Sequence, residues 1–184
     1  MSELLTLLNR SGALRPGHTV FRNGAHADGW IEKGDVFKDS RLLNTVAQVQ
    51  ATHIAQNFGE ATLLVGAPAC GGTLTSFIGL HLGLPVAYVL TENPLHWHRM
   101  HVPGQPQRSI YIDDLICTGT GTRAVTHFLH SQGHEVLGVS AWLSRATLEM
   151  PTLTLDAHPF HTFRAPDCPL CHEGQPVIWN GIRE

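Results

Sequence analysis

Apolar residues follow a helical spacing at two places in the first third of the chain. Closely spaced leucines predict a short amphipathic helix over residues 2–10. Glycines at short intervals predict a small extended segment over residues 13–38, with the glycines at its turns. A second helical pattern then predicts a longer helix that begins at Asp39 or Ser40 and runs to about Phe58.

From residue 61 the pattern changes to strands that alternate with helices. Continuous apolar runs indicate strands that are buried on both faces. They cover residues 61–68, 85–90, 109–112 and 135–143. Helical patterns occupy 71–82 and about 120–132, and a loop is expected over 91–108. This alternation predicts an α/β fold with a parallel sheet of about five strands and helices on both of its faces.

The chain has 184 residues, of which 42% are hydrophobic, and this size suits one domain with a core of its own. We therefore predict a single domain over residues 1–184. Its parts would be an N-terminal helix and extended segment at 1–38, an α/β core at 39–150 and a less regular C-terminal segment at 151–184.

Composition argues against several classes of protein. No apolar run approaches the roughly 18–20 residues of a membrane span, so no membrane association is expected. The net charge is −3 and there is no basic stripe, so no nucleic-acid binding is expected either. The N-terminus MSELLTLLNRSG lacks the pattern of a secretory signal, and the four cysteines do not resemble a disulfide framework. A cytoplasmic protein is therefore expected.

The strongest chemical signal is the segment SIYIDDLICTGTGTR at residues 109–123. Asp113 and Asp114 end an apolar strand, and a loop of threonine and glycine then enters a helix. Open α/β sheets bind ligands beyond such strand ends. Backbone N–H groups and hydroxyls at a helix start suit a phosphate, whereas paired carboxylates suit sugar hydroxyls or a hydrated Mg²⁺.

An ordinary polar turn is the alternative for this segment, because loops of glycine and threonine are common. The adjacent carboxylates favour a ligand site, since burying two like charges side by side is costly unless a ligand or cation uses them. Neither GxxxxGK[ST] nor GxGxxG occurs in the segment, so it is neither a Walker loop nor a dinucleotide-binding fingerprint.

IYIDDLICTGTGT resembles the motif with which type I phosphoribosyltransferases bind 5-phosphoribosyl 1-pyrophosphate (PRPP). The orotate phosphoribosyltransferase subfamily is the most similar. Residues 11–31 resemble its N-terminal hood, 63–89 its GPA-x-x-G strand–helix unit, 142–145 a strand that ends in arginine, and 168–177 a C-terminal stretch of some members. The likeness covers most of the chain in the family's order. It implies a Rossmann-like type I phosphoribosyltransferase fold with a small hood. The implied activity is phosphoribosyl transfer from PRPP to a nucleobase, and the similarity to this subfamily favours orotate as the base and hence pyrimidine biosynthesis.

The resemblance also implies roles for individual residues. Asp113 and Asp114 would hold the ribose hydroxyls and, through PRPP, the cofactor Mg²⁺. The PRPP site would comprise Asp113, Asp114, Leu115, Ile116, Cys117, Thr118, Gly119, Thr120, Gly121 and Thr122, with Cys70 and Gly71 near the pyrophosphate. Arg145, Arg22, Trp30 and Ile31 would contact the base, and the guanidinium of Arg145 suits the carboxylate of orotate. A homodimer is implied too, in which one subunit's loop reaches the other's site.

The sequence departs from the family where lysines would surround the pyrophosphate. Cys70 stands in the place of one of them, and residues 90–94 bring no Lys or Arg to the mobile loop. Both lysines of the chain, Lys33 and Lys38, precede residue 40. The groups proposed to replace them in catalysis are His96 and Arg99.

Two alternative functions therefore stay open beside orotate transfer. The missing lysines favour a non-catalytic regulatory protein that binds PRPP or a nucleotide. A phosphoribosyltransferase for another base, such as a purine, is the third possibility.

Cys168-Pro169-Leu170-Cys171-His172 has the spacing of one half of a zinc site. No second ligand pair occurs at the expected spacing. We therefore favour a surface turn with two buried thiols, or a tie for the C-terminal tail, over a metal site.

Overall fold

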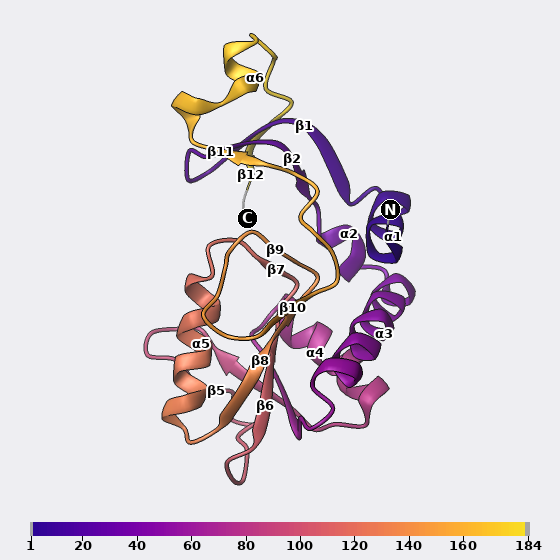
Figure 1. Cartoon of the computed structure of the whole chain (residues 1–184), viewed down its shortest axis with the longest axis vertical. Coiled ribbons are helices and arrows are strands. Elements are labelled where there is room, and N and C mark those ends of the chain that lie inside the picture. Colours follow the sequence, from indigo (N-terminus) through magenta and orange to yellow (C-terminus); the bar gives the residue numbers. More distant parts are fainter. Residues whose placement is uncertain (1, 183–184) are drawn as a thin grey trace. The chain divides into compact units, whose positions relative to one another are not determined.

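The computed structural model describes residues 2–182, and the chain divides into two compact units. The first unit combines the residues up to Asp39 with the segment from His158 onward, and the second unit is Ser40–Ala157 (Figure 1). The units divide between residues 39 and 40, whereas the sequence placed a segment boundary between residues 38 and 39 of a single predicted domain. Residues 151–157, which the sequence assigned to the C-terminal segment, belong to the core unit instead.

The second unit is built on a six-stranded sheet with the order β10-β8-β6-β3-β4-β5. Its strands are β3 (Leu63–Gly66), β4 (Val86–Leu90), β5 (His96–Trp97), β6 (Arg108–Ile112), β8 (Glu135–Ala141) and β10 (Thr152–Thr154). All neighbours pair in parallel except β4 and β5, which are antiparallel. The α/β fold and its parallel sheet are thus confirmed. The additions are β5, inside the segment predicted as a loop, and β10, where the sequence has no clear period.

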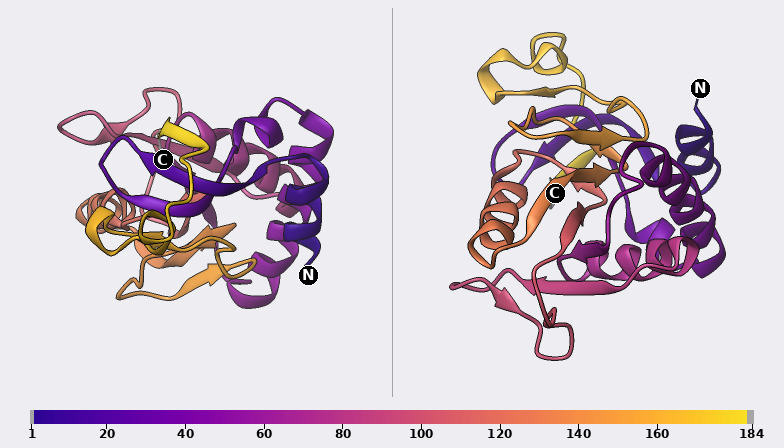
Figure 2. Two further views of the ribbon diagram at one scale, coloured as in Figure 1. Left: turned by 90° about the horizontal axis from the view of Figure 1, so that it is seen from above. Right: turned by 60° about the horizontal axis from the view of Figure 1, so that its bottom comes forward.

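Helices cover both faces of this sheet, as predicted (Figure 2). They are α3 (Ser40–Asn57), α4 (Cys70–Leu82) and α5 (Thr120–Ser131). On one face, Val125 and Leu129 of α5 belong to the same buried cluster as Tyr111 of β6. On the other face, Gln50 of α3 donates a hydrogen bond of 3.0 Å to the hydroxyl of Ser140 in β8, and α3 packs against α4. Coverage of both faces explains why the central strands are apolar at consecutive positions.

The first unit is a four-stranded sheet with the order β11-β2-β1-β12. An antiparallel hairpin of β1 (Leu14–Phe21) and β2 (His26–Ile31) forms its centre. β11 (Thr162–Phe163) pairs antiparallel with β2, and β12 (Trp179–Ile182) pairs in parallel with β1. The C-terminal segment therefore supplies both edge strands of a sheet whose centre comes from the N-terminus.

Short helices complete the first unit. They are α1 (Glu3–Arg10), α2 (Gly34–Phe37), the 3-10 turn η1 (Ala165–Asp167) and α6 (Pro169–His172). The side chain of Ser2 caps α1 by accepting a hydrogen bond from the N–H of Leu5, and Leu4 and Leu8 are buried, which confirms the predicted amphipathic helix. Within residues 2–182, no helix has both the length and the apolar character that crossing a membrane requires.

Candidate functional site

Asp113 and Asp114 lie directly after β6, at the carboxyl edge of the parallel sheet. The backbone N–H of Asp113 donates a hydrogen bond of 2.9 Å to the carbonyl of Ser140, and the N–H of Trp142 donates one of 3.0 Å to the carbonyl of Asp114. The ends of β6 and β8 therefore hold each other in register. This pairing fixes where the two acidic residues leave the sheet.

The carboxylate of Asp113 is held by two hydrogen bonds. One oxygen accepts the N–H of Asp114 at 2.9 Å, and the other accepts the Tyr111 hydroxyl at 3.3 Å. Burial, and then the charge of Asp113, raise the pKa of Tyr111 well above its ordinary value, so this hydroxyl stays protonated and keeps donating. Asp114 is only 2% exposed. At the strand end, the carboxylate of Asp113 is thus fixed in orientation and that of Asp114 is buried.

A second pair of short strands continues beyond the acidic residues. β7 (Leu115–Ile116) and β9 (Leu143–Ser144) pair in parallel, and the N–H of Arg145 donates a hydrogen bond of 2.8 Å to the carbonyl of Ile116. The backbone of Arg145 therefore lies beside the segment that leads into the glycine/threonine turn. The structure brings this predicted base-contact residue to the same edge of the sheet as Asp113 and Asp114.

Gly119 shapes the turn before α5. Its φ of +76° lies in the left-handed region, and a Cβ there would come within 2.7 Å of the Arg123 guanidinium and 2.8 Å of the Leu148 side chain. The first N–H groups of a helix have no partner within the helix. Gly119 itself offers no side-chain cap, and the N–H of Thr120 donates only a long hydrogen bond of 3.4 Å to the Thr118 hydroxyl. A Cβ on Gly121 would meet nothing within 4 Å, so the backbone is open to an approaching group at this point. We call residues 113–122 the phosphate loop, because open N–H groups at a helix start suit an anion.

The threonines of the phosphate loop differ in their surroundings. Thr118 and Thr120 are exposed, and the Thr118 hydroxyl donates a hydrogen bond of 3.1 Å to the Thr120 hydroxyl. Thr122 is only 3% exposed. A phosphate at this turn would therefore meet the hydroxyls of Thr118 and Thr120, but mainly the backbone of Thr122.

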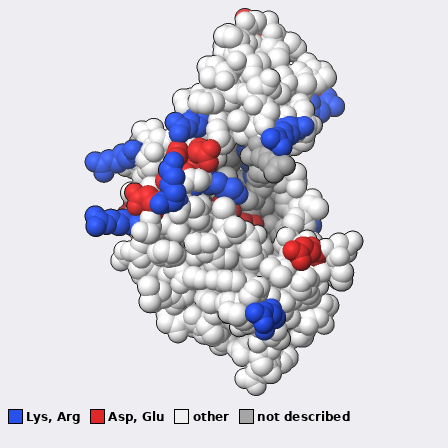
Figure 3. All heavy atoms as spheres, turned by 180° about the vertical axis from the view of Figure 1, so that it is seen from behind, with Lys and Arg blue, Asp and Glu red and all other residues white. Residues whose placement is uncertain are grey.

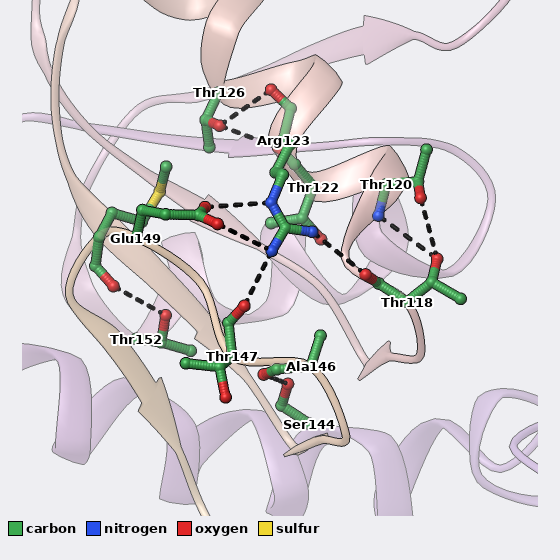
Figure 4. A network of polar contacts seen from close by, with 11 residues as sticks. Thr118, Thr120, Thr122, Arg123, Thr126, Ser144, Ala146, Thr147, Glu149 and Thr152 are labelled. Atoms are coloured by element: carbon green, nitrogen blue, oxygen red, sulfur yellow. Dashed lines mark hydrogen bonds and ion pairs between the residues drawn. The ribbon is translucent and has the colours of Figure 1, made fainter.

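Arg123 braces the phosphate loop, a role that the sequence did not reveal. Figure 4 shows its guanidinium between Thr118 and the segment 146–149. It donates hydrogen bonds to the carbonyls of Thr118 (3.2 Å) and Thr147 (2.8 Å) and to both carboxylate oxygens of Glu149 (3.0 and 3.1 Å). Hydrogen bonding to Arg123 lowers the pKa of Glu149, and hydrogen bonding to Glu149 raises that of Arg123. An arginine three residues beyond a helix start is too common a pattern to have indicated this brace.

The start of α4 approaches the same strand end. Gly71 is buried, and a Cβ there would lie 3.1 Å from the carbonyl of Ile112 and 3.7 Å from the carboxylate of Asp113. Cys70, the first residue of α4, is partly exposed. Both residues predicted near the pyrophosphate therefore lie in the helix turn that borders Asp113.

His96 and Arg99 are not brought to the phosphate loop within the chain. β5, which carries His96, is separated from β6 by β3 and β4. Neighbouring strands lie about 4.8 Å apart, so these three steps amount to about 14 Å. The His96 ring is 3.0 Å from the carbonyl of Pro94, and Arg99 is exposed. Their catalytic role stays a prediction. Within one chain, His96 lies too far from the phosphate loop to act there.

The remaining residues predicted to contact a base lie in the first unit. Arg22 is exposed, and its Nε donates a hydrogen bond of 3.0 Å to the carbonyl of Gly181. Trp30 packs edge-to-face on Trp179, and Ile31 is buried, with 7% of its surface exposed. Their role toward a base stays a prediction.

The surface charge is mixed, as the low net charge suggests. Figure 3 shows Lys and Arg side chains beside Asp and Glu side chains on one face of the described residues. One such group is Asp35, whose carboxylate pairs with Arg15 at 2.7 Å and Lys38 at 2.5 Å. One of the two lysines is thus engaged in an ion pair in the first unit.

Comparisons with known proteins agree with this arrangement. No protein-family model matches the chain. The orotate phosphoribosyltransferase of Desulforamulus reducens is 27% identical over 188 residues, which cover 99% of this chain and 97% of the relative. The crystal structure of orotate phosphoribosyltransferase from Aeropyrum pernix superposes with a TM-score of 0.74 at 18% identity, covering 84% of this chain and 93% of that one. This chain has the type I phosphoribosyltransferase fold.

The fold by itself does not select the base. Adenine phosphoribosyltransferase from Trypanosoma brucei, solved in complex with AMP, pyrophosphate and ribose 5-phosphate, also superposes, with a TM-score of 0.63 at 13% identity. That match covers 84% of this chain and 79% of that one. The similarity to orotate phosphoribosyltransferases predicted from the sequence is confirmed, whereas the substrate is a separate question.

Proposed function

We propose that the protein transfers the 5-phosphoribosyl group of PRPP to orotate, giving orotidine 5′-phosphate and pyrophosphate. The observation that carries the proposal is the phosphate loop. It joins two carboxylates at the end of β6, that of Asp113 oriented by hydrogen bonds, to an open glycine/threonine turn at the start of α5. The names of the full-length relatives support the same activity.

The phosphate loop suits the ribose 5-phosphate part of PRPP. Backbone N–H groups at the start of α5, together with the hydroxyls of Thr118 and Thr120, would donate to the 5′-phosphate. Asp113 and Asp114 would accept hydrogen bonds from the ribose hydroxyls, because a carboxylate repels phosphate but accepts from a hydroxyl. Held at both ends, the sugar would present C1 to the base.

The same carboxylates fit the magnesium ion that the fold family implies. Carboxylate oxygens are ligands that Mg²⁺ prefers, and hydrogen bonds from Tyr111 and Asp114 orient the Asp113 carboxylate at the strand end. When bound with PRPP, Mg²⁺ would offset negative charge on the pyrophosphate.

In the proposed reaction, a ring nitrogen of the base forms a bond to C1 of the ribose while the bond from C1 to the pyrophosphate oxygen breaks. The pyrophosphate leaves with the bonding electrons, and the base nitrogen loses its proton. The contribution of this chain would be to hold the two reactants in line and to fix the ribose, since orientation alone accounts for much of the rate of such reactions.

Orotate is proposed as the base because Arg145 lies beside the phosphate loop and the relatives carry that name. A guanidinium can pair with the orotate carboxylate through two parallel hydrogen bonds. The test is pyrophosphate release from PRPP and Mg²⁺ with orotate, uracil, adenine, guanine and hypoxanthine in turn. Orotate alone should support release, and Arg145→Ala should raise the KM for orotate more than that for PRPP. Release with a purine alone would overturn the choice of base.

A second candidate is a regulatory protein that binds PRPP without turning it over. The observation that favours it is that residues 40–184 contain no lysine, so the unit that holds the phosphate loop has no lysine of its own to offset charge on a leaving pyrophosphate. Calorimetric binding of PRPP with Mg²⁺, combined with no pyrophosphate release with any base, would establish this function.

A homodimer would reconcile His96 and Arg99 with catalysis. Because β5 lies about 14 Å from β6 within the chain, we propose that the loop 91–108 acts at the site of a second subunit. Mixing an Asp114→Asn subunit with an Arg99→Gln subunit tests this. Activity should return in the mixture if each mixed dimer retains one complete site, and no recovery would count against a shared site.

A further inference from the structure

Four potential metal ligands meet within the first unit, whereas the phosphate loop belongs to the second. His18 of β1, His26 of β2, and Cys168 and Cys171 around α6 each place one ligand atom within 4.8 Å of all the others. We call these four side chains the tail cluster. Cys168 and Cys171 are not joined by a disulfide. The expectation of two buried thiols is half wrong, because Cys168 is buried but Cys171 is exposed.

We propose that the tail cluster binds one Zn²⁺ ion and thereby fastens the C-terminal segment to the N-terminal hairpin. Two cysteines and two histidines are a common ligand set for structural zinc. The sequence showed only the CxxC half of this set. The histidines are invisible in the sequence because they precede the cysteines by more than 140 residues and are joined to them only by the sheet.

The distances in the tail cluster match a tetrahedral site. Zinc binds sulfur at about 2.3 Å and nitrogen at about 2.0–2.1 Å, so tetrahedral angles place S and N ligands about 3.6 Å apart. Cys168 Sγ and Cys171 Sγ lie 3.7 and 3.6 Å from His18 Nε2, and Cys171 Sγ lies 3.3 Å from His26 Nδ1. The two ring nitrogens are 3.0 Å apart. These four distances are close to those of a tetrahedral zinc site, and all four ligand atoms lie within 4.8 Å of one another.

Hydrogen bonds between the four side chains do not explain why their ligand atoms lie so close together. His18 Nδ1 lies 2.9 Å from the carbonyl of Gln175 and so donates to it, which leaves Nε2 with a single lone pair. Three ligand atoms crowd around that lone pair, and a ring nitrogen accepts one well-aligned hydrogen bond. A cation at the centre would use all four lone pairs at once. The bond from Nδ1 to a carbonyl is also the usual outer partner of a metal-bound histidine, because it fixes the tautomer that presents Nε2 to the ion.

The C-terminal segment shows why a metal ion would be needed. Residues 164–178 cross from β11 to β12, on opposite edges of the sheet. Cys168 is the only one of them that is buried, and all but Leu170 of the others are exposed. A segment without an apolar core of its own requires another device to stay folded, and a structural metal is one. His18 is 2% exposed, whereas the exposed Cys171 leaves the ion a path of entry.

The first test is metal analysis of the full chain. Protein stripped of metal, reloaded with Zn²⁺ and dialysed should hold one ion per chain by mass spectrometry. Cobalt in its place should give the visible absorption of a tetrahedral thiolate site. Cys171→Ser and His26→Gln should each lower the zinc content at least about tenfold. His172→Gln is the matched control, because His172 follows the CxxC motif but bonds the carbonyl of Pro166 instead of joining the cluster.

A second measurement covers variants that fold poorly. Removing zinc from the wild-type chain with a zinc-selective chelator should lower Tm by about 5 °C or more and speed amide exchange chiefly within residues 164–178. Failure of the reloaded protein to retain zinc would overturn the proposal. So would a disulfide between Cys168 and Cys171 in the purified protein, or unchanged zinc in both Cys171→Ser and His26→Gln. Retention of iron in preference to zinc would overturn the choice of metal.

Discussion

The phosphate loop and the tail cluster are built in opposite ways. The phosphate loop is one continuous segment of ten residues, shaped by its backbone pairing with β8 and β9 and by one glycine with a positive φ. The tail cluster joins side chains from segments up to 153 residues apart in the chain. A continuous loop keeps its shape without a ligand, because its neighbours in the sheet fix it. A cluster drawn from distant segments has to offset a larger loss of chain entropy, and a bound ion can do so.

The largest expected effect of a single substitution is in the phosphate loop. Under the proposed function, Asp114→Asn should lower PRPP-dependent turnover by about 10²–10³, because it would remove a charge that acts on the ribose and Mg²⁺. The zinc content should stay unchanged. Steady-state pyrophosphate release and metal analysis of the same sample check both statements.

Glu135→Gln is the control for Asp114→Asn. Glu135 is an exposed carboxylate at the other end of β8, where it pairs with Arg108 at 3.2 Å. Exposed pairs of this kind contribute little to stability, so activity should stay within about twofold. Turnover of Asp114→Asn within tenfold of the wild type would show that the carboxylate does not act on the substrate.

Two glycine substitutions distinguish the two features of the turn, which are its left-handed backbone at Gly119 and the empty space around Gly121. Gly119→Ala should destabilise the fold by about 1–3 kcal/mol, because it combines a left-handed residue with a Cβ that collides with Arg123 and Leu148. Gly121→Ala has open space and no positive φ, so stability should stay within about 0.5 kcal/mol. Denaturant unfolding measures the difference. Equal losses in the two variants would mean that the turn is not shaped by Gly119.

Both glycine variants should also raise the KM for PRPP if phosphate sits on this turn. For Gly119→Ala the cause would be a distorted turn, and for Gly121→Ala a methyl group in the open space that the phosphate would use. A Gly121→Ala variant with wild-type stability and wild-type KM would place the phosphate elsewhere.

The contrast between the two sites also explains what the sequence could reveal. The sheet, its helices and the carboxylate–glycine–threonine segment were predicted because each depends on residues close together in the chain. β10 and β5 were missed, since strands of three and two residues are too short to show a period. The histidines of the tail cluster were missed for a different reason. Their meeting with Cys168 and Cys171 depends on β11 and β12 pairing with an N-terminal hairpin, and no local pattern encodes that pairing.

Arg123 stabilises the phosphate loop indirectly, by hydrogen bonds that join Thr118 to Thr147 and Glu149. Arg123→Gln should raise the KM for PRPP about three- to tenfold while leaving kcat near the wild-type value, since the loop would sample more conformations before binding. Arg108→Gln is the matched control, as Arg108 is another partly exposed arginine, which pairs with two carboxylates, Glu60 and Glu135, at the amino edge of the same sheet. An unchanged KM in Arg123→Gln would show that the brace is dispensable.

The brace should be intact at neutral pH. Hydrogen bonding to Arg123 holds the pKa of Glu149 below its ordinary value. A depressed carboxyl pKa gives stability that is present above the ordinary value and is lost as pH falls through the lowered one. The effect of Glu149→Gln on the KM for PRPP should therefore be constant from pH 6 to 8, because the carboxyl group is fully ionised throughout this range.

The smallest expected effect joins the two sites in one experiment. The phosphate loop belongs to the unit Ser40–Ala157, together with its backbone partner Ser140 and the two residues that bind Arg123, Thr147 and Glu149. The tail cluster lies wholly in the other unit. Loss of zinc in Cys171→Ser should therefore change the Kd for PRPP by less than about twofold, even as it lowers Tm. Calorimetry with Mg²⁺ present throughout measures the binding. A Kd weakened more than tenfold would mean that the phosphate loop depends on the fastened tail. In that case the conformation of the phosphate loop would depend on the zinc-bound tail as well as on the neighbouring strands of its own sheet.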